Sequence, residues 1–174
     1  MVAIRYRMQA GFPGDPNRAH PFSIEPCLVD ATNPPTQFGQ AVVINRAANS
    51  VRAILAGDVA LTHIWGVTVR PYPFQQFSAT NYGAAAFGQA TPPSNGSIDV
   101  LRWGYIMGLL NTGALQPAKG DPVFIWCAAT AGNHIQGGYE TAASAGNTMA
   151  LDPNSYEFNG PGDALGNIEI ICHN

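Results

Sequence analysis

The chain has 174 residues and a mass of 18.4 kDa, which is enough for one domain with a sizeable hydrophobic core. Hydrophobic residues make up 46% of the chain, whereas disordered proteins are poor in such residues and rich in charge, so we exclude a disordered chain. The formal net charge is −3 and no run of Lys or Arg is present, which argues against a nucleic-acid partner.

Glycine and proline are frequent, with 19 and 14 residues, which predicts a turn-rich chain with little helix. Charged residues are only 11% of the chain, against about 25% in ordinary soluble domains. Such sparse charge suits a surface that a partner covers. We expect no membrane partner, because no apolar run approaches the roughly 18 residues of a transmembrane span. Three widely spaced cysteines and the lack of a signal-peptide pattern indicate free thiols in a reducing cytoplasm.

Residues 1–20 are predicted to form an extended N-terminal arm. In residues 2–8, apolar and other residues alternate with a period of two, as in a half-buried strand. The glycines and prolines of residues 11–17 then interrupt regular structure. The alternative is that residues 2–8 form a strand of the main sheet. The remaining residues, 21–174, are predicted to form a single β-rich domain.

Short apolar segments separated by turn clusters follow along residues 21–174. These segments are residues 22–29, 38–44, 51–55, 61–69, 98–110, 123–128, 134–141 and 168–172. The pattern predicts an all-β fold, an antiparallel β-sandwich or barrel of jelly-roll-like form with long loops. In residues 99–109 the odd positions, from Leu101 to Leu109, share one face that we expect to line the core, and the glycines between them suggest a bulge or a close backbone approach. Residues 84–87 and 142–150 are the two candidate helices.

A proline-rich aromatic segment covers residues 69–77. Its alternating prolines favour an extended backbone and remove hydrogen-bond donors. Tyr72, Phe74 and Phe77 would then project from a stiff loop as anchors for a partner. The alternative is that these aromatic rings fold back as a lid on the core.

The sequence lacks a pattern of catalytic, cofactor or metal-binding residues. His20, His63, His134 and His173 have no ligand spacing, although a barrel could bring the first three together. Residues 143–146 lack the first glycine of a nucleophile elbow, and no phosphate-binding glycine loop is present. We therefore predict no enzyme, no cofactor and no metal, with a barrel-type metal-dependent or serine hydrolase as the alternative.

A series of turn-and-strand segments runs in order along most of the chain. They are residues 11–15, 24–26, 38–43, 65–71, 102–106, 118–125 and 166–170. In this order they resemble the structural cement, or decoration, proteins of tailed-bacteriophage capsids. Residues 72–95 match no pattern of that family.

The resemblance implies a non-enzymatic protein on the outer surface of the virion, made in the host cytoplasm. Its partner would be the major capsid protein, bound where neighbouring subunits meet, and it would strengthen the shell against the packed genome. A dimer or trimer at a capsid symmetry axis would multiply the contacts. The alternative is another β-rich virion protein, such as a head-completion, tail or fibre component. The predicted interface residues are Arg5, Tyr6, Arg7, Met8, Phe12, Arg70, Tyr72, Phe74 and Phe77.

Overall fold

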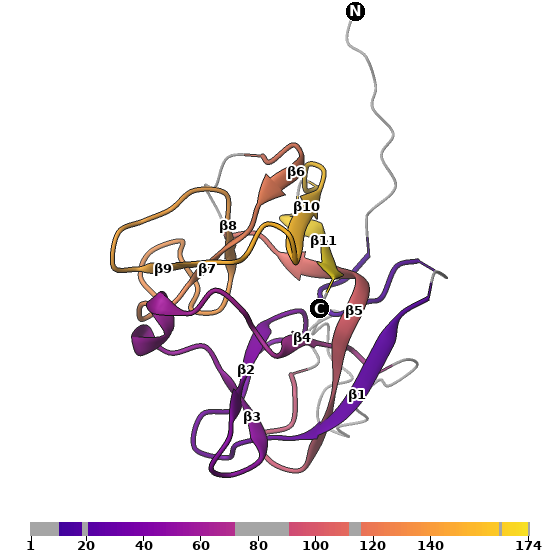
Figure 1. Ribbon diagram of the computed structural model, residues 1–174, viewed down its shortest axis with the longest axis vertical. Helices are drawn as coiled ribbons and strands as arrows, with labels where there is room; N and C mark the ends of the chain where they lie inside the picture. The colour runs from indigo at the N-terminus through magenta and orange to yellow at the C-terminus, as the bar shows by residue number, and fades with distance from the viewer. Residues whose placement is uncertain (1–10, 19–20, 72–90, 112–115, 164, 174) are drawn as a thin grey trace, which may run out of the picture.

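The computed structural model describes residues 11–18, 21–71, 91–111, 116–163 and 165–173, and their architecture is all-β (Figure 1). The strands are β1 (Ser23–Leu28), β2 (Ala41–Asn45), β3 (Ser50–Ala53), β4 (Gly66–Thr68), β5 (Ser97–Leu109), β6 (Lys119–Pro122), β7 (Phe124–Trp126), β8 (Tyr139–Glu140), β9 (Thr148–Ala150), β10 (Tyr156–Asn159) and β11 (Asn167–His173). A short 3-10 helix, η1 (Ala56–Ala60), connects β3 to β4. Each apolar segment predicted from the sequence overlaps one of these strands.

The strands form two antiparallel sheets. The larger has eight strands in the order β3-β2-β4-β5-β11-β10-β6, with β1 paired to β5, and the smaller has the order β8-β7-β9. A one-residue bridge between Val29 and Val51 brings the end of β1 back to β3. The ladders among the described strands do not close into a barrel. The predicted antiparallel all-β fold is therefore confirmed, in its sandwich form.

Strand β5 is the long central element of the larger sheet. Its first half pairs with β1 and β4, and its second half pairs with β11 (Figure 1). Leu101 and Ile106 both lie in the main core, although one position is odd and the other even. Gly104 lies between them with φ +127°, a conformation that glycine adopts readily and that interrupts the alternation of side chains. The prediction that the odd positions line the core is confirmed for Leu101 and wrong for Trp103, Tyr105 and Leu109, which are only partly buried. Met107 is fully buried, but it is not a member of the main core cluster.

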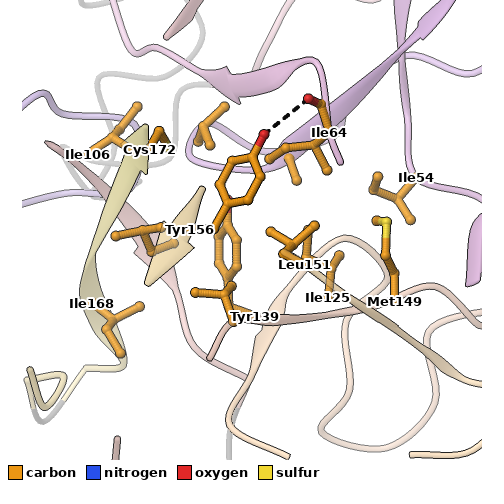
Figure 2. Close-up of a cluster of buried hydrophobic side chains, with 14 of the residues drawn as sticks. Ile54, Ile64, Ile106, Ile125, Tyr139, Met149, Leu151, Tyr156, Ile168 and Cys172 are labelled. Atoms are coloured by element: carbon orange, nitrogen blue, oxygen red, sulfur yellow. Dashed lines mark hydrogen bonds between the residues drawn. The ribbon is translucent and has the colours of Figure 1, made fainter. Parts of the chain in front are cut away.

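The main core lies between the two sheets. Figure 2 shows Tyr139 and Tyr156 at its centre, with the Tyr156 hydroxyl donating to the carbonyl oxygen of Ile64 at 3.2 Å. Gly108 of β5 allows the close approach expected of a strand glycine, because a Cβ there would clash with the Tyr139 ring and lie 2.7 Å from Ile170 Cδ1. A second, smaller cluster forms between β1, β2, β3 and β5. Its buried members are Val29, Phe38, Val42, Val51, Ile98 and Val100.

Three short strands differ from the sequence prediction. Residues 142–150 are not helical: a turn precedes β9, in which the backbone nitrogen of Ser144 donates to Thr148 Oγ1 at 2.8 Å. Such bonds between side chain and backbone compete with helix formation. Residues 117–122, one of the turn clusters between the predicted apolar segments, include edge strand β6, and β10 was not predicted as a strand. The other candidate helix, residues 84–87, lies outside the described residues.

Candidate interaction surface

Residues 11–18, the described part of the predicted arm, lie along the second half of β5. The backbone nitrogen of Gly14 donates to Met107 O at 2.7 Å, and Met107 N donates to Asp15 O at 3.0 Å. Pro16 forms a bridge with Ile106. Because these bonds are made to the central strand of the large sheet, this stretch is fixed to the body of the protein.

Gly14 fits a site that excludes any side chain. Its φ is +89°, and a Cβ at this position would lie 2.8 Å from Phe38 Cβ and 2.9 Å from Arg70 N. The carbonyl oxygen of Gly14 accepts a hydrogen bond from Arg70 N at 2.8 Å. Glycine therefore allows residues 11–15 to pack directly against the chain at Arg70, two residues after the end of β4.

An ion pair fixes the other end of the same stretch. Arg18 donates to Glu169 from Nε at 2.9 Å and from Nη2 at 2.7 Å, and its guanidinium carbon lies 4.4 Å from the centre of the Tyr105 ring. Asn159 also donates to Glu169. Burial alone would raise the pKa of the Glu169 carboxyl, but the hydrogen bonds from Arg18 and Asn159 outweigh it and hold the pKa below its ordinary value. Glu169 is thus the charged acceptor that ties residues 11–18 to β11.

Exposed Phe12 and half-buried Arg70 lie side by side at the surface of this region. The Arg70 guanidinium carbon lies 5.0 Å from the centre of the Phe12 ring, and Phe12 is 43% exposed. Within the described residues, no carboxylate forms an ion pair with Arg70. We call Phe12, Pro13, Arg70 and Pro71 the Phe12–Arg70 surface. It offers an exposed aromatic ring beside a cation, the combination that dominates many protein interfaces.

Of the nine predicted interface residues, the structure describes these two and brings them together. The other seven lie outside the described residues; they are Arg5, Tyr6, Arg7, Met8, Tyr72, Phe74 and Phe77. Because Arg70 N bonds to Gly14 O, the end of the described chain at Pro71 is next to the stretch that begins at Gly11. Both predicted anchor segments therefore join the described body at the Phe12–Arg70 surface.

A polar network, which sequence reasoning missed, lies beside the small sheet. The buried Glu140 carboxylate accepts from Asn111 Nδ2 at 2.5 Å and contacts His134 Nδ1 at 2.6 Å, and the His134 ring stacks on Trp126 with centroids 4.3 Å apart. Glu140 lies six residues after His134, a spacing that matches no motif, so this contact could not be predicted from the sequence.

The other ionisable groups of the described region do not gather into one site. The His63 ring lies 3.9 Å from Asp152, on a different segment from His134, and His20 lies outside the described residues. Within the ranges that the structure covers, no group of three His, Cys, Asp or Glu side chains is placed to hold a metal ion. Burial raises the pKa of the Cys127 thiol to about 11 and that of Cys172 to about 12, so both thiols stay protonated at neutral pH. No helix in the described ranges has the length and apolar character needed to cross a membrane.

Comparison with known proteins gives a family and similar solved structures. A family model described as XM1 gp53 minor capsid protein matches residues 1–172. A chain from a solved structure titled "The capsid of Myoviridae Phage XM1" superposes with a TM-score of 0.63 and is 16% identical, over 97% of this chain and 94% of that chain. At this identity the superposition shows a shared fold. No curated protein sequence matches the chain.

Proposed function

The chain belongs to the XM1 gp53 minor capsid protein family, and from this premise we propose that it is a cement protein that binds the outer surface of a bacteriophage capsid and bridges neighbouring major capsid proteins. The family match agrees with the sequence resemblance to capsid proteins of tailed phages. It extends over residues 1–172 and is the observation that carries the proposal. The family is a structural one, and we propose for this chain no catalytic activity, no cofactor, and no nucleic-acid or membrane partner.

The proposed mechanism is linkage between binding and assembly. A pressurised shell fails at the seams between subunits, so a protein that contacts two subunits at once binds the assembled geometry more tightly than its separate parts. Whatever binds only the assembled state stabilises that state. A dimer or trimer at a symmetry axis would add further contacts with every copy.

The Phe12–Arg70 surface supports this mechanism because it joins both predicted anchor segments to one rigid base. In the proposal, residues 2–8 add as an extended strand to a sheet edge of the capsid subunit. Arg5 and Arg7 would pair with acidic residues there, and the Arg70 cation, which lacks a carboxylate partner in the described region, would do the same.

The attachment of residues 11–18 explains how the predicted N-terminal arm could bear a mechanical force without detaching from the domain. The backbone bonds of Gly14 and Asp15 to Met107, together with the Arg18–Glu169 ion pair, connect this stretch to β5 and β11, which pair with each other along the centre of the large sheet. A pull on the N-terminal residues is therefore distributed over several backbone bonds and an ion pair before it reaches the core. A tether between capsid subunits requires such a connection.

Co-sedimentation with purified shells tests the proposal. The protein is mixed with mature, expanded shells and with immature shells of its phage, and bound protein is measured in the pellet. Selective binding to expanded shells is expected, and the Phe12→Ala/Arg70→Ala double variant should bind more weakly. Binding that is equal for both shells, or confined to tails, would favour the alternative of another virion component.

A further inference from the structure

The sequence contains two Asn-Gly pairs, and the structure places them in opposite surroundings. Asn95 and Gly96 lie in an exposed turn just before β5, whereas Asn159 ends strand β10 and Gly160 is buried. We propose that Asn95 is a site of spontaneous deamidation in the folded protein and that the fold protects Asn159. Asparagine is a chemically labile residue, and local structure decides how often its backbone can reach a reactive geometry.

The reaction needs only water and the chain itself. The backbone nitrogen of Gly96, having lost its proton to base, attacks the side-chain carbonyl carbon Cγ of Asn95 and closes a five-membered succinimide ring. The bond between Cγ and the side-chain nitrogen breaks, and the nitrogen leaves as ammonia. Water then opens the ring at one of its two carbonyl carbons, giving aspartate or isoaspartate. Glycine as the next residue favours ring closure because it has no side chain to obstruct the attack.

The surroundings of Asn95 leave this approach open. Residues 93–97 are all exposed, and a Cβ placed on Gly96, whose φ is +90°, would meet nothing within 4 Å. In the described ranges the Asn95 side chain makes no hydrogen bond that ring closure would have to break. The turn therefore allows the nitrogen and the side chain to meet without disturbing packed structure.

Asn159 is held away from the same reaction. Its side-chain nitrogen donates a hydrogen bond to Glu169, which also accepts a hydrogen bond from Arg18. Its backbone lies opposite Lys119 in the ladder between β10 and β6. Ring closure would have to rotate this amide off Glu169 and twist the end of a paired strand. Since Gly160 is buried as well, the reactive geometry requires local unfolding of β10.

Deamidation at Asn95 would alter the end of the β1–β5 ladder. Either product adds a negative charge to a chain whose net charge is −3. Isoaspartate also lengthens the main chain by one carbon between residue 95 and Gly96, whose carbonyl oxygen accepts from Val29 N at 2.8 Å. We therefore expect the isoaspartate form to weaken that bond, next to Leu28, which is 59% exposed.

The test compares the two sites within one protein. Wild-type protein is incubated at mildly alkaline pH, digested, and its peptides are fragmented by mass spectrometry to locate each converted amide. In the folded protein, conversion at Asn95 should exceed that at Asn159 by at least an order of magnitude, while in urea the two sites should convert at comparable rates. The Asn95→Gln variant, whose side chain would need a larger ring, should lose the fast reaction.

Three results would overturn the inference. The first is conversion of Asn159 as fast as Asn95 in the folded protein. The second is an Asn95 that stays intact in the folded protein while it converts in urea. The third is an Asn159 that also resists in urea, because its stability would then come from neighbouring residues and not from the fold.

Discussion

Arg18 and Glu169 are separated by 151 positions in the chain, yet their side chains meet through two hydrogen bonds of 2.9 and 2.7 Å. The pair joins the N-terminal stretch to the last strand of the large sheet, β11. It therefore fixes the stretch on which the Phe12–Arg70 surface is built.

Replacing Arg18 should loosen this attachment without unfolding the protein. Because the Arg18 side chain is 47% exposed, water screens the pair, and we expect Arg18→Ala to lower the free energy of unfolding by only about 0.5 kcal/mol. Arg46→Ala, at an exposed arginine in a turn, is the matched control and should change stability less. Urea unfolding measures both. Equal losses for the two variants would contradict a specific role for the Arg18–Glu169 pair.

A side chain at Gly14 should destabilise the protein clearly. Gly14→Ala would strain a backbone at φ +89° and press a Cβ against Phe38 and Arg70, at a cost of about 1–3 kcal/mol. Gly57→Ala is the control, because a Cβ there would meet nothing within 4 Å and the backbone is helical. Thermal melting should separate the two variants, and a Gly14→Ala protein as stable as the Gly57→Ala protein would show that residues 11–15 are not packed as described.

Two buried tyrosines should respond in opposite ways to loss of their hydroxyl. The Tyr139 hydroxyl is buried without a hydrogen-bond partner among the described groups, so Tyr139→Phe should leave stability unchanged or raise it by up to about 1 kcal/mol. The Tyr156 hydroxyl donates to Ile64 O, so Tyr156→Phe should lower stability by about 1 kcal/mol. Guanidinium unfolding of both variants is the measurement. A large loss for Tyr139→Phe would reveal a partner for that hydroxyl.

Acid should weaken the fold partly through Asp58. Burial alone would raise the pKa of the Asp58 carboxyl, but hydrogen bonds from Arg52 and from Leu55 N outweigh it and keep the pKa below its ordinary value. A carboxyl whose pKa is lower in the folded state stabilises the protein above its ordinary pKa, and this stability is lost as the pH falls through the lowered value.

The Asp58→Asn variant checks this pH dependence. At neutral pH it should be less stable than the wild type by about 2 kcal/mol, because partly buried Arg52 loses its counterion. As the pH falls below the ordinary range of aspartate, the two stabilities should converge. Asp99→Asn, at an exposed carboxylate, is the control. A stability gap for Asp58→Asn that stays constant down to strongly acidic pH would contradict the assignment.

Two N-terminal truncations should separate binding from folding. Removal of residues 1–10 leaves the backbone bonds of Gly14 and Asp15 to Met107 and the Arg18–Glu169 pair in place. The melting temperature should therefore stay the same while binding to expanded shells weakens. Removal of residues 1–18 takes these bonds away and should also lower the melting temperature. If the shorter truncation unfolds the protein, residues 2–8 form a strand of the main sheet, which is the alternative that the sequence left open.

The sequence predicts the strands that lie in apolar runs, including the short strands β4, β7 and β8, and misses β6, β9 and β10. Strand β5 is evident from its apolar run, but its change of phase at Gly104 depends on a φ of +127° that no alternation pattern reveals. Residues 119–122 read as a turn because glycine, aspartate and proline dominate them, yet they pair with β10 at the sheet edge. For β10 the alternation of Tyr156 and Phe158, both fully buried, is a signal that could have identified the strand.

For the candidate surface, too, the sequence predicts some features and not others: it identifies single residues but not the contacts between them. Phe12 and Arg70 stand out in the sequence because each lies in a conspicuous proline-containing segment, and both were predicted as interface residues. Their mutual contact was not predictable, since it depends on the Gly14 turn packing against the chain at residue 70. The Arg18–Glu169 pair likewise joins residues that no local pattern connects. Residue patterns along the chain can identify candidate interface segments, but the contacts between distant segments are known only from the fold.

Electron cryo-microscopy of the mature virion tests the central claim most directly. We predict density for this chain on the outer face of the shell, at the junctions between neighbouring major capsid proteins, with the Phe12–Arg70 surface turned toward them. Density confined to the neck or tail, or a shell without this chain, would contradict it.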